Sequence, residues 1–184
     1  MNSQLAAVVL CGGFSTRMGR DKGSIPAGDS IWAVQAAAKA ILLNLDIYYS
    51  IREEQLPLYS PYIDADRFII DNSPLEGPLK GLATAHQLFP EQDIFLLACD
   101  MPSLPCTTAY TLIREYVSCS NDFFAFYDDG FYQPFCAVYT SAGLKQVLEL
   151  QPSSLQEVLR RGDTLQILPP DATAFQHRNA PDLL

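Results

Sequence analysis

Residues 5–13 have the sequence Leu5-Ala6-Ala7-Val8-Val9-Leu10-Cys11-Gly12-Gly13. An unbroken apolar run that ends in paired glycines is typical of a strand buried on both faces and leading into a tight loop. Buried strands of this kind occur mainly in parallel sheets that are covered by helices on both sides. The run therefore predicts the first strand of an α/β fold.

Strand-like and helix-like segments alternate through the first two thirds of the chain, which indicates βαβ units. We expect further strands at 47–51, 67–70, 94–98, 123–127, 134–139 and 164–168. Helices are expected at 33–42, 82–88, 108–117, 141–150 and 154–160, with Gly77-Pro78 opening the second of them near Leu79. The first helix is indicated by the helical spacing of Ala33, Val34, Ala36, Ala37, Ala40, Ile41 and Leu42 among strong helix formers.

The predicted architecture is a Rossmann-like three-layer α/β sandwich that forms one domain over residues 1–184, with a mostly parallel central sheet. Asp128-Asp129-Gly130 has the composition of a hairpin turn between two of the expected strands, so one antiparallel element is predicted. Ligands of such sheets bind at the carboxyl ends of the strands. The loops at 11–26, 71–81 and 99–104 are therefore the places to search for a site.

Composition excludes several classes of function. A net charge of −9 argues against a nucleic-acid partner. The longest apolar runs are too short to span a bilayer, so no membrane association is expected. The five cysteines are odd in number and irregular in spacing, and no CxxC pair could hold zinc. Reduced thiols and a cytoplasmic location are the expectation.

The loop after the first strand concentrates positive charge in this acidic chain. Arg17, Arg20 and Lys22 lie within six residues of one another, shortly after Gly12-Gly13. Glycines let the backbone approach a ligand closely, and successive N–H groups can hold phosphate oxygens. Arg17 and Lys22 would add charge-assisted hydrogen bonds. The loop is neither a Walker A loop nor a GxGxxG motif, and it predicts an anion site of another type.

The expected strand at 94–98 is followed by Asp100, and the strand at 67–70 by Asp71. Mg²⁺ typically takes one or two carboxylates together with substrate phosphates and water. A carboxylate at the end of a central strand could hold such an ion against the α-phosphate of a nucleotide. Asp100 is therefore the candidate metal ligand, although a carboxylate at this place could also serve as a turn residue or helix cap.

The pattern GGxSxRMGxDK at residues 12–22 resembles the signature loop of the molybdenum cofactor guanylyltransferase (MobA-like) family of the nucleoside-triphosphate transferase superfamily. Other segments are similar to the same family and stand in its order. They are Gly77-Pro78-Leu79-Lys80-Gly81, Cys99-Asp100-Met101-Pro102-Ser103-Leu104, Gln133-Pro134-Phe135-Cys136-Ala137-Val138-Tyr139 and a reduced C-terminal Asn179-Ala180-Pro181-Asp182. Together they cover the whole chain.

The resemblance implies a nucleotidyltransferase that moves GMP from GTP to the phosphate of a molybdenum-bound pterin and releases pyrophosphate, with Mg²⁺ as cofactor. It implies catalytic roles for Arg17, Lys22 and Asp100, with Asp100 on the metal. The nucleotide-binding set is then Leu10, Cys11, Gly12, Gly13, Arg17, Lys22, Asp71, Gly77, Gly81 and Asp100. Beyond its small-molecule substrates, a GTP-binding accessory protein and molybdoenzyme chaperones are candidate partners.

Two alternatives stay open at this point. The first is a cytidylyl- or sugar-phosphate nucleotidyltransferase of the same fold, against which Asp21-Lys22 after Met18-Gly19 favours the guanylyl family. The second is a catalytically idle nucleotide-binding scaffold, which the joint presence of Arg17, Lys22 and Asp100 opposes. Ser50 stands where some relatives carry Asn, which weakens any claim for that position. Cys11 and Cys99 are expected to be small packing residues.

Overall fold

The computed structural model describes residues 4–13, 21–170 and 175. Its centre is a sheet of seven strands in the order β5-β4-β1-β6-β8-β7-β9. Four neighbouring strands run parallel, namely β5 (Phe68–Ile70), β4 (Asp46–Ile51), β1 (Leu5–Leu10) and β6 (Asp93–Ala98). Every residue of β1 and β6 is buried, which confirms that the apolar run at 5–10 is an interior strand covered on both faces.

The strand β8 (Phe131–Tyr139) is antiparallel to both of its neighbours, β6 and β7 (Phe123–Asp128). The last strand, β9 (Thr164–Ile167), pairs parallel with β7. Asp129 and Gly130 form the β7–β8 turn with φ values of 47° and 83°, as a tight hairpin requires. The sheet therefore has the mostly parallel arrangement with one antiparallel element that the sequence predicts.

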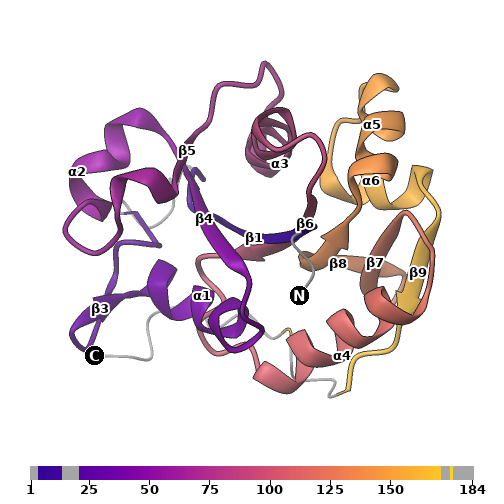
Figure 1. Ribbon diagram of the computed structural model, residues 1–184, viewed down its shortest axis with the longest axis horizontal. Helices are drawn as coiled ribbons and strands as arrows, with labels where there is room; N and C mark the ends of the chain where they lie inside the picture. Colours follow the sequence, from indigo (N-terminus) through magenta and orange to yellow (C-terminus); the bar gives the residue numbers. More distant parts are fainter. Residues whose placement is uncertain (1–3, 14–20, 171–174, 176–184) are drawn as a thin grey trace.

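Helices cover both faces of the sheet, which completes the three layers (Figure 1). One apolar core lies between the sheet and α1 (Trp32–Leu42) and α4 (Cys106–Ser118). The other core lies between the sheet and α3 (Gly77–Leu88), α5 (Ser141–Glu149) and α6 (Leu155–Arg161). Side chains of β1 alternate between the two cores, with Val9 in the first and Val8 in the second.

Short elements complete the fold around the first core. They are the hairpin of β2 (Pro26–Ala27) and β3 (Ser30–Ile31), the 3-10 helices η1 (Glu53–Gln55) and η2 (Ala65–Arg67), and the single-turn α2 (Leu56–Tyr59). None of these was predicted, because they are shorter than the periodicity that identifies an element in a sequence. No helix in the described part of the chain is long and apolar enough to cross a bilayer.

The helix predicted at 33–42 from the spacing of its residues is confirmed as α1, but not all of its apolar residues face the core. Ile41 and Leu42 are 59% and 71% exposed, whereas Lys39 is only 3% exposed. Ala33, Ala36, Ala37 and Ala40 do face the core, so the helical period is right. The buried face continues through Lys39, a residue that hydrophobicity alone places on the outside.

Candidate active site

A cavity of about 220 Å³ opens at the carboxyl ends of β1, β4, β5 and β6. The ends of the strands supply its floor, and the start of α3 and a side chain of β8 supply further walls. Its lining residues are Leu10, Cys11, Gly12, Gly13, Lys22, Ser50, Asp71, Gly77, Pro78, Gly81, Ala98, Cys99, Asp100 and Phe135. The cavity thus lies where ligands bind in sheets of this class.

Nine of the ten residues that the sequence nominates line this one cavity. They come from the end of β1 and from three separate stretches of the chain, 11–22, 71–81 and 99–104. The tenth, Arg17, lies outside the described residues, as does the C-terminal segment Asn179–Asp182. The sequence did not nominate Pro78, Ala98, Cys99 or Phe135, although each of these four stands inside or beside a segment that the resemblance had marked, and it discounted Ser50.

Lys22 and Asp100 face each other across the mouth of the cavity. The Lys22 Nζ donates to Oδ2 of Asp100 at 2.8 Å, and the two side chains are 38% and 25% exposed. A partly exposed ion pair of this kind contributes little to stability. Both groups are accessible to a ligand, the ammonium to phosphate oxygens and the carboxylate to a cation.

Asp71 is held against the glycine loop. Its Oδ1 accepts a hydrogen bond of 2.6 Å from Oγ of Ser50. A Cβ on Gly12 would overlap Oδ2 of Asp71, so only glycine allows this approach. Burial raises the pKa of the Asp71 carboxyl, and the bond from Ser50 opposes that rise. Ser50 therefore orients a half-buried acid, a role that the sequence had not assigned.

The N-terminus of α3 points at the cavity. Gly77 begins the helix with φ at +59°, a left-handed conformation that favours glycine, and lines the cavity with Pro78. One turn later, a Cβ on Gly81 would overlap Oγ of Ser50 and press on Leu10. The partial positive charge of a helix N-terminus favours an anion at this wall.

The backbone of the glycine loop is anchored at its start and open at its tip. The Cys11 N–H donates to the Ser50 carbonyl at 2.8 Å, extending the β1–β4 pairing by one residue. The Gly12 carbonyl accepts a hydrogen bond from Nη1 of Arg52. Within the described ranges, the N–H groups of Gly12 and Gly13 have no acceptor. These two groups are available to phosphate oxygens.

Beneath the loop lies a polar cluster that sequence reasoning missed. The Tyr59 hydroxyl and the Ser24 N–H both donate to Oδ1 of Asp21, at 2.5 Å and 2.9 Å. Gln55 Nε2 donates to the other oxygen of Asp21 and, at 2.9 Å, to the Cys11 carbonyl. Burial raises the pKa of the fully buried Tyr59 phenol. The cluster ties the residue before Lys22 to the end of β1.

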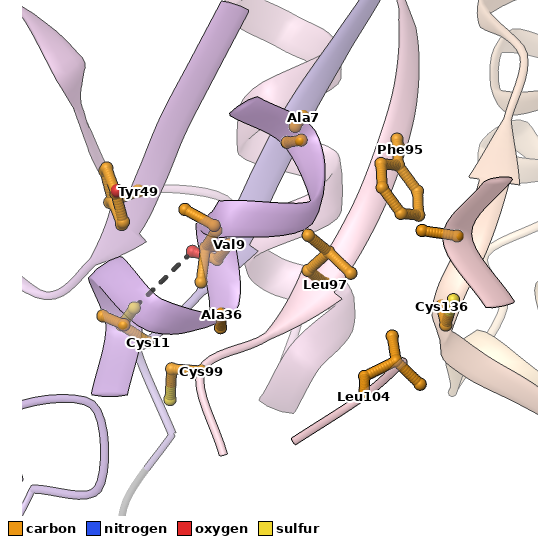
Figure 2. Close-up of a cluster of buried hydrophobic side chains, with 14 of the residues drawn as sticks. Ala7, Val9, Cys11, Ala36, Tyr49, Phe95, Leu97, Cys99, Leu104 and Cys136 are labelled. Carbon is orange, nitrogen blue, oxygen red and sulfur yellow. Dashed lines mark hydrogen bonds between the residues drawn. The ribbon is translucent and has the colours of Figure 1, made fainter. Parts of the chain in front are cut away.

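Cys11 and Cys99 lie among apolar side chains, as expected of packing residues. Figure 2 shows both in the cluster with Val9 and Leu97, and the dashed line marks the contact from Sγ of Cys11 to the Val9 carbonyl at 3.7 Å. Burial raises the pKa of the Cys11 thiol well above its ordinary value, which makes it a poor nucleophile. All five cysteines are free thiols.

These groups can bind a polyanion and neutralise charge that develops on it. An exposed lysine, two available backbone N–H groups and a helix N-terminus converge on one cavity that also presents two carboxylates. In the described part of the chain, no cluster of three or more His, Cys, Asp or Glu residues could hold a metal by itself. The arrangement suits a ligand whose phosphates share a cation with Asp100.

The sequence pattern of the family described as MobA-like NTP transferase domain matches residues 7–165. A relative from Carboxydothermus hydrogenoformans, described as a probable molybdenum cofactor guanylyltransferase, is 33% identical over 109 residues, covering 55% of this chain and 49% of that protein. The chain spans about half the length of the curated relatives it matches.

Solved structures of several activities share the fold. Molybdopterin-guanine dinucleotide biosynthesis protein A from Archaeoglobus fulgidus superimposes with a TM-score of 0.71 at 20% identity, covering 89% of this chain and 83% of that one. The 4-diphosphocytidyl-2C-methyl-D-erythritol synthase from Anaerococcus prevotii gives a TM-score of 0.65 at 9% identity, covering 94% and 89%. At these identities the likeness concerns the fold.

Proposed function

This chain belongs to the MobA-like NTP transferase domain family, and on that premise we propose that it transfers GMP from GTP to the phosphate of a molybdenum-bound pterin, releasing pyrophosphate. The observation that carries the proposal is the convergence of the family's loops on one cavity, with Lys22 and Asp100 at its mouth. The curated relatives named as guanylyltransferases support GTP as the donor.

The cavity offers separate places for the two ends of a nucleotide. In the proposed pose the triphosphate lies along the N–H groups of Gly12 and Gly13, and Lys22 contacts its oxygens. The nucleoside then lies toward Asp71 and the start of α3, where the half-buried carboxylate can accept hydrogen bonds from ribose or base. Arg17, which lies outside the described residues, is proposed to hold the departing phosphates.

The residues present fit a Mg²⁺ ion that arrives with the nucleotide. Asp100 supplies one partly exposed carboxylate, which is the usual protein share of a Mg²⁺ site completed by phosphates and water. When bound, Mg²⁺ would neutralise phosphate charge. Lys22 must leave Asp100 for this to occur, and the triphosphate gives its ammonium new acceptors. We therefore propose Lys22 and Asp100 as catalytic residues, with Asp100 as the metal ligand.

The proposed reaction needs no covalent intermediate on the protein. An oxygen of the acceptor phosphate forms a bond to the α-phosphorus, and the bond from that phosphorus to the bridging oxygen of the β-phosphate breaks. The electron pair leaves with pyrophosphate, whose charge Lys22 stabilises. Such transfers depend on positioning and charge neutralisation. The buried, weakly acidic thiol of Cys11 agrees with this absence of a nucleophile.

A cytidylyltransferase is the second candidate, because a diphosphocytidyl synthase shares the fold at nearly the same TM-score as the guanine dinucleotide protein. The experiment that separates them is binding of GTP, CTP, ATP and UTP, each with and without Mg²⁺, by calorimetry. A Mg²⁺-dependent preference for GTP, followed by pyrophosphate release with the molybdenum-pterin acceptor, is the expected result. A preference for CTP would replace the proposed donor, and binding of none would leave the idle scaffold.

We further propose a cytoplasmic location, which five unpaired cysteines support. A GTP-binding accessory protein and molybdoenzyme chaperones are the proposed protein partners, as the family resemblance implies. Co-purification with a molybdoenzyme chaperone from cells that make the cofactor would test this.

A further inference from the structure

Lys39 is a charged residue on the buried face of α1. Its side chain lies beside Ala36 and Ala40, and the residue is 3% exposed. The ammonium donates to three backbone carbonyls, those of Gln35 at 3.4 Å, Met101 at 3.4 Å and Pro102 at 2.5 Å. An ammonium has three protons, so these acceptors can satisfy its full hydrogen-bonding capacity. A buried lysine is tolerated when its ammonium is hydrogen-bonded in this way.

No carboxylate accompanies this ammonium within residues 4–13, 21–170 and 175. Burial lowers the pKa of Lys39, with only weak opposing effects from the thiols of Cys106 and Cys136. In a lysine that is buried to form an ion pair, the carboxylate partner would instead raise the pKa. Its principal partners outside its own helix are instead the carbonyls of Met101 and Pro102, which directly follow Asp100.

The loop that contains Asp100 has few internal restraints of its own. The Met101 N–H donates to the Ala98 carbonyl at 3.3 Å, and the Leu104 N–H donates to the Met101 carbonyl at 3.2 Å. Both bonds are long for N–H···O contacts. The shortest bond recorded for residues 101–104 is the one from Lys39 to the Pro102 carbonyl. Lys39 therefore ties the loop to α1, a helix packed on β1 and β6.

We infer that Lys39 is a positioning residue, which holds the 99–104 loop so that the Asp100 carboxylate stays opposite Lys22. It does not line the cavity, so it acts through the loop and touches no substrate. Its effect on turnover rests on the proposed function, whereas its effect on the loop does not. An apolar side chain at position 39 could pack among the alanines, but the Pro102 carbonyl would lose its donor and the Met101 carbonyl would keep only the Leu104 N–H.

The test compares Lys39→Met and Lys39→Arg with Ala40→Gly. Ala40 is the next residue of α1 and is fully buried, so the control weakens the same helix without touching the loop. Hydrogen exchange of the 99–104 amides is measured against the amides of β6. We expect Lys39→Met to raise the ratio of the exchange rate of the 99–104 amides to that of the β6 amides by about tenfold or more. In Lys39→Arg and in Ala40→Gly this ratio should stay close to that of wild type.

Kinetics with GTP and the pterin acceptor provide the second measurement. We expect Lys39→Met to lower kcat by about tenfold while KM for GTP changes by less than about threefold, because Asp100 acts mainly in the transition state. Lys39→Arg should restore most of kcat. An exchange ratio in Lys39→Met equal to that of Ala40→Gly would overturn the inference. Lack of turnover in the wild type would instead refute the proposed function, and the exchange experiment would still decide the role of Lys39.

If Lys39→Met does not fold, Lys39→Gln takes its place, since an amide can donate to one of the two loop carbonyls. Intermediate exchange of the 99–104 amides is then expected, and wild-type exchange would overturn the inference.

Discussion

The Lys22 ammonium contacts Oδ2 of Asp100 at 2.8 Å, although the two residues are separated by 78 positions in the chain. The proposed phosphate-binding cation and the proposed metal-binding carboxylate therefore neutralise each other before any ligand arrives. A triphosphate that attracts Lys22 exposes Asp100 to a cation, and a cation on Asp100 releases Lys22 to phosphates. Binding of the two ligands should be coupled, and the coupling must be reciprocal.

Asp100→Asn tests this relationship. We expect turnover to fall by at least about 100-fold, because charge neutralisation at the transferring phosphate is lost. Affinity for GTP without Mg²⁺ should rise by about threefold, since a negative charge beside the phosphates disappears. Pyrophosphate release and calorimetry measure the two effects. The melting temperature should stay near that of wild type, because the ion pair is partly exposed.

The control for this variant is Asp46→Asn, which removes an exposed carboxylate paired with Arg67 at 3.2 Å, outside the cavity. It should leave turnover and GTP affinity unchanged. An Asp100→Asn enzyme that keeps its activity would show that the metal assignment is wrong.

Gly12→Ala should weaken nucleotide binding by steric displacement of Asp71. The added methyl group overlaps Oδ2 of Asp71, a half-buried acid that is also held by Ser50. We expect GTP affinity to fall by about tenfold or more, because the displaced Asp71 carboxylate no longer has the position that binding of the nucleoside requires. Gly130→Ala, at a φ of 83° in the β7–β8 turn, is the control for general backbone strain. Equal GTP affinity in the two variants would contradict the proposed role of the Gly12–Asp71 contact.

Prediction from sequence succeeded for the features that a continuous apolar run determines, namely the central strands and the fold class. The strand at 5–10 and the strand at 94–98 are apolar throughout because both of their faces are covered by helices. The carboxyl ends of these two strands indicated where the candidate site lies. The loops after them carry the candidate residues, so the parallel arrangement alone brings Gly12 and Asp100 together. This is why the fold class and the place of the site could be predicted from the pattern, whereas the set of ten candidate residues, nine of which line the cavity, came from the family resemblance.

The features that were missed depend on side-chain hydrogen bonds between residues that are far apart in the sequence. Lys39 carries a charge and so reads as a surface residue, yet its acceptors are carbonyls 62 and 63 positions later. Tyr59 lies on a helix of four residues, too short to show a period. Ser50 was discounted because of its residue type, although its hydroxyl holds Asp71. No local pattern encodes such partners.

The raised pKa of Asp71 predicts a pH dependence of stability. Its folded-state pKa exceeds the ordinary value of 3.8, because burial disfavours the charged form. The folded state therefore binds the proton more tightly than the unfolded state, and the contribution of Asp71 to stability is lost as pH rises through the folded-state pKa. Asp71→Asn should remove this loss, since the amide oxygen can still accept from Ser50.

Urea unfolding of wild type and Asp71→Asn between pH 3 and pH 7 checks the sign. The stability of the variant relative to wild type should increase with pH over that interval. A relative stability that falls with rising pH would mean that the Asp71 carboxylate is stabilised in the folded state, contrary to its burial.

Two variants, one near the carboxyl ends of the central strands and one at their amino ends, should separate effects on the stability of the protein from effects on ligand binding. Tyr59→Phe removes the hydroxyl of a fully buried side chain that donates to Asp21, next to Lys22, and leaves a partly buried carboxylate oxygen with one bond fewer. Asp93→Asn, at the start of β6, weakens bonds to the Tyr116 hydroxyl at 2.7 Å and the Ser141 N–H at 2.8 Å. Each change should lower the free energy of unfolding by about 1–3 kcal/mol, as expected when a partner of a buried polar group is lost or impaired.

GTP binding should distinguish the two variants, because their local consequences differ. Loosening Asp21 frees the segment that presents Lys22, so Tyr59→Phe should reduce GTP affinity by about three- to tenfold. Asp93 lies at the amino end of β6 and Asp100 beyond its carboxyl end, so Asp93→Asn should leave GTP affinity within about twofold of wild type at a temperature where both are folded. Equal losses of affinity would mean that overall stability governs the site. Loss in Tyr59→Phe alone would show that the buried cluster under the glycine loop sets the position of Lys22.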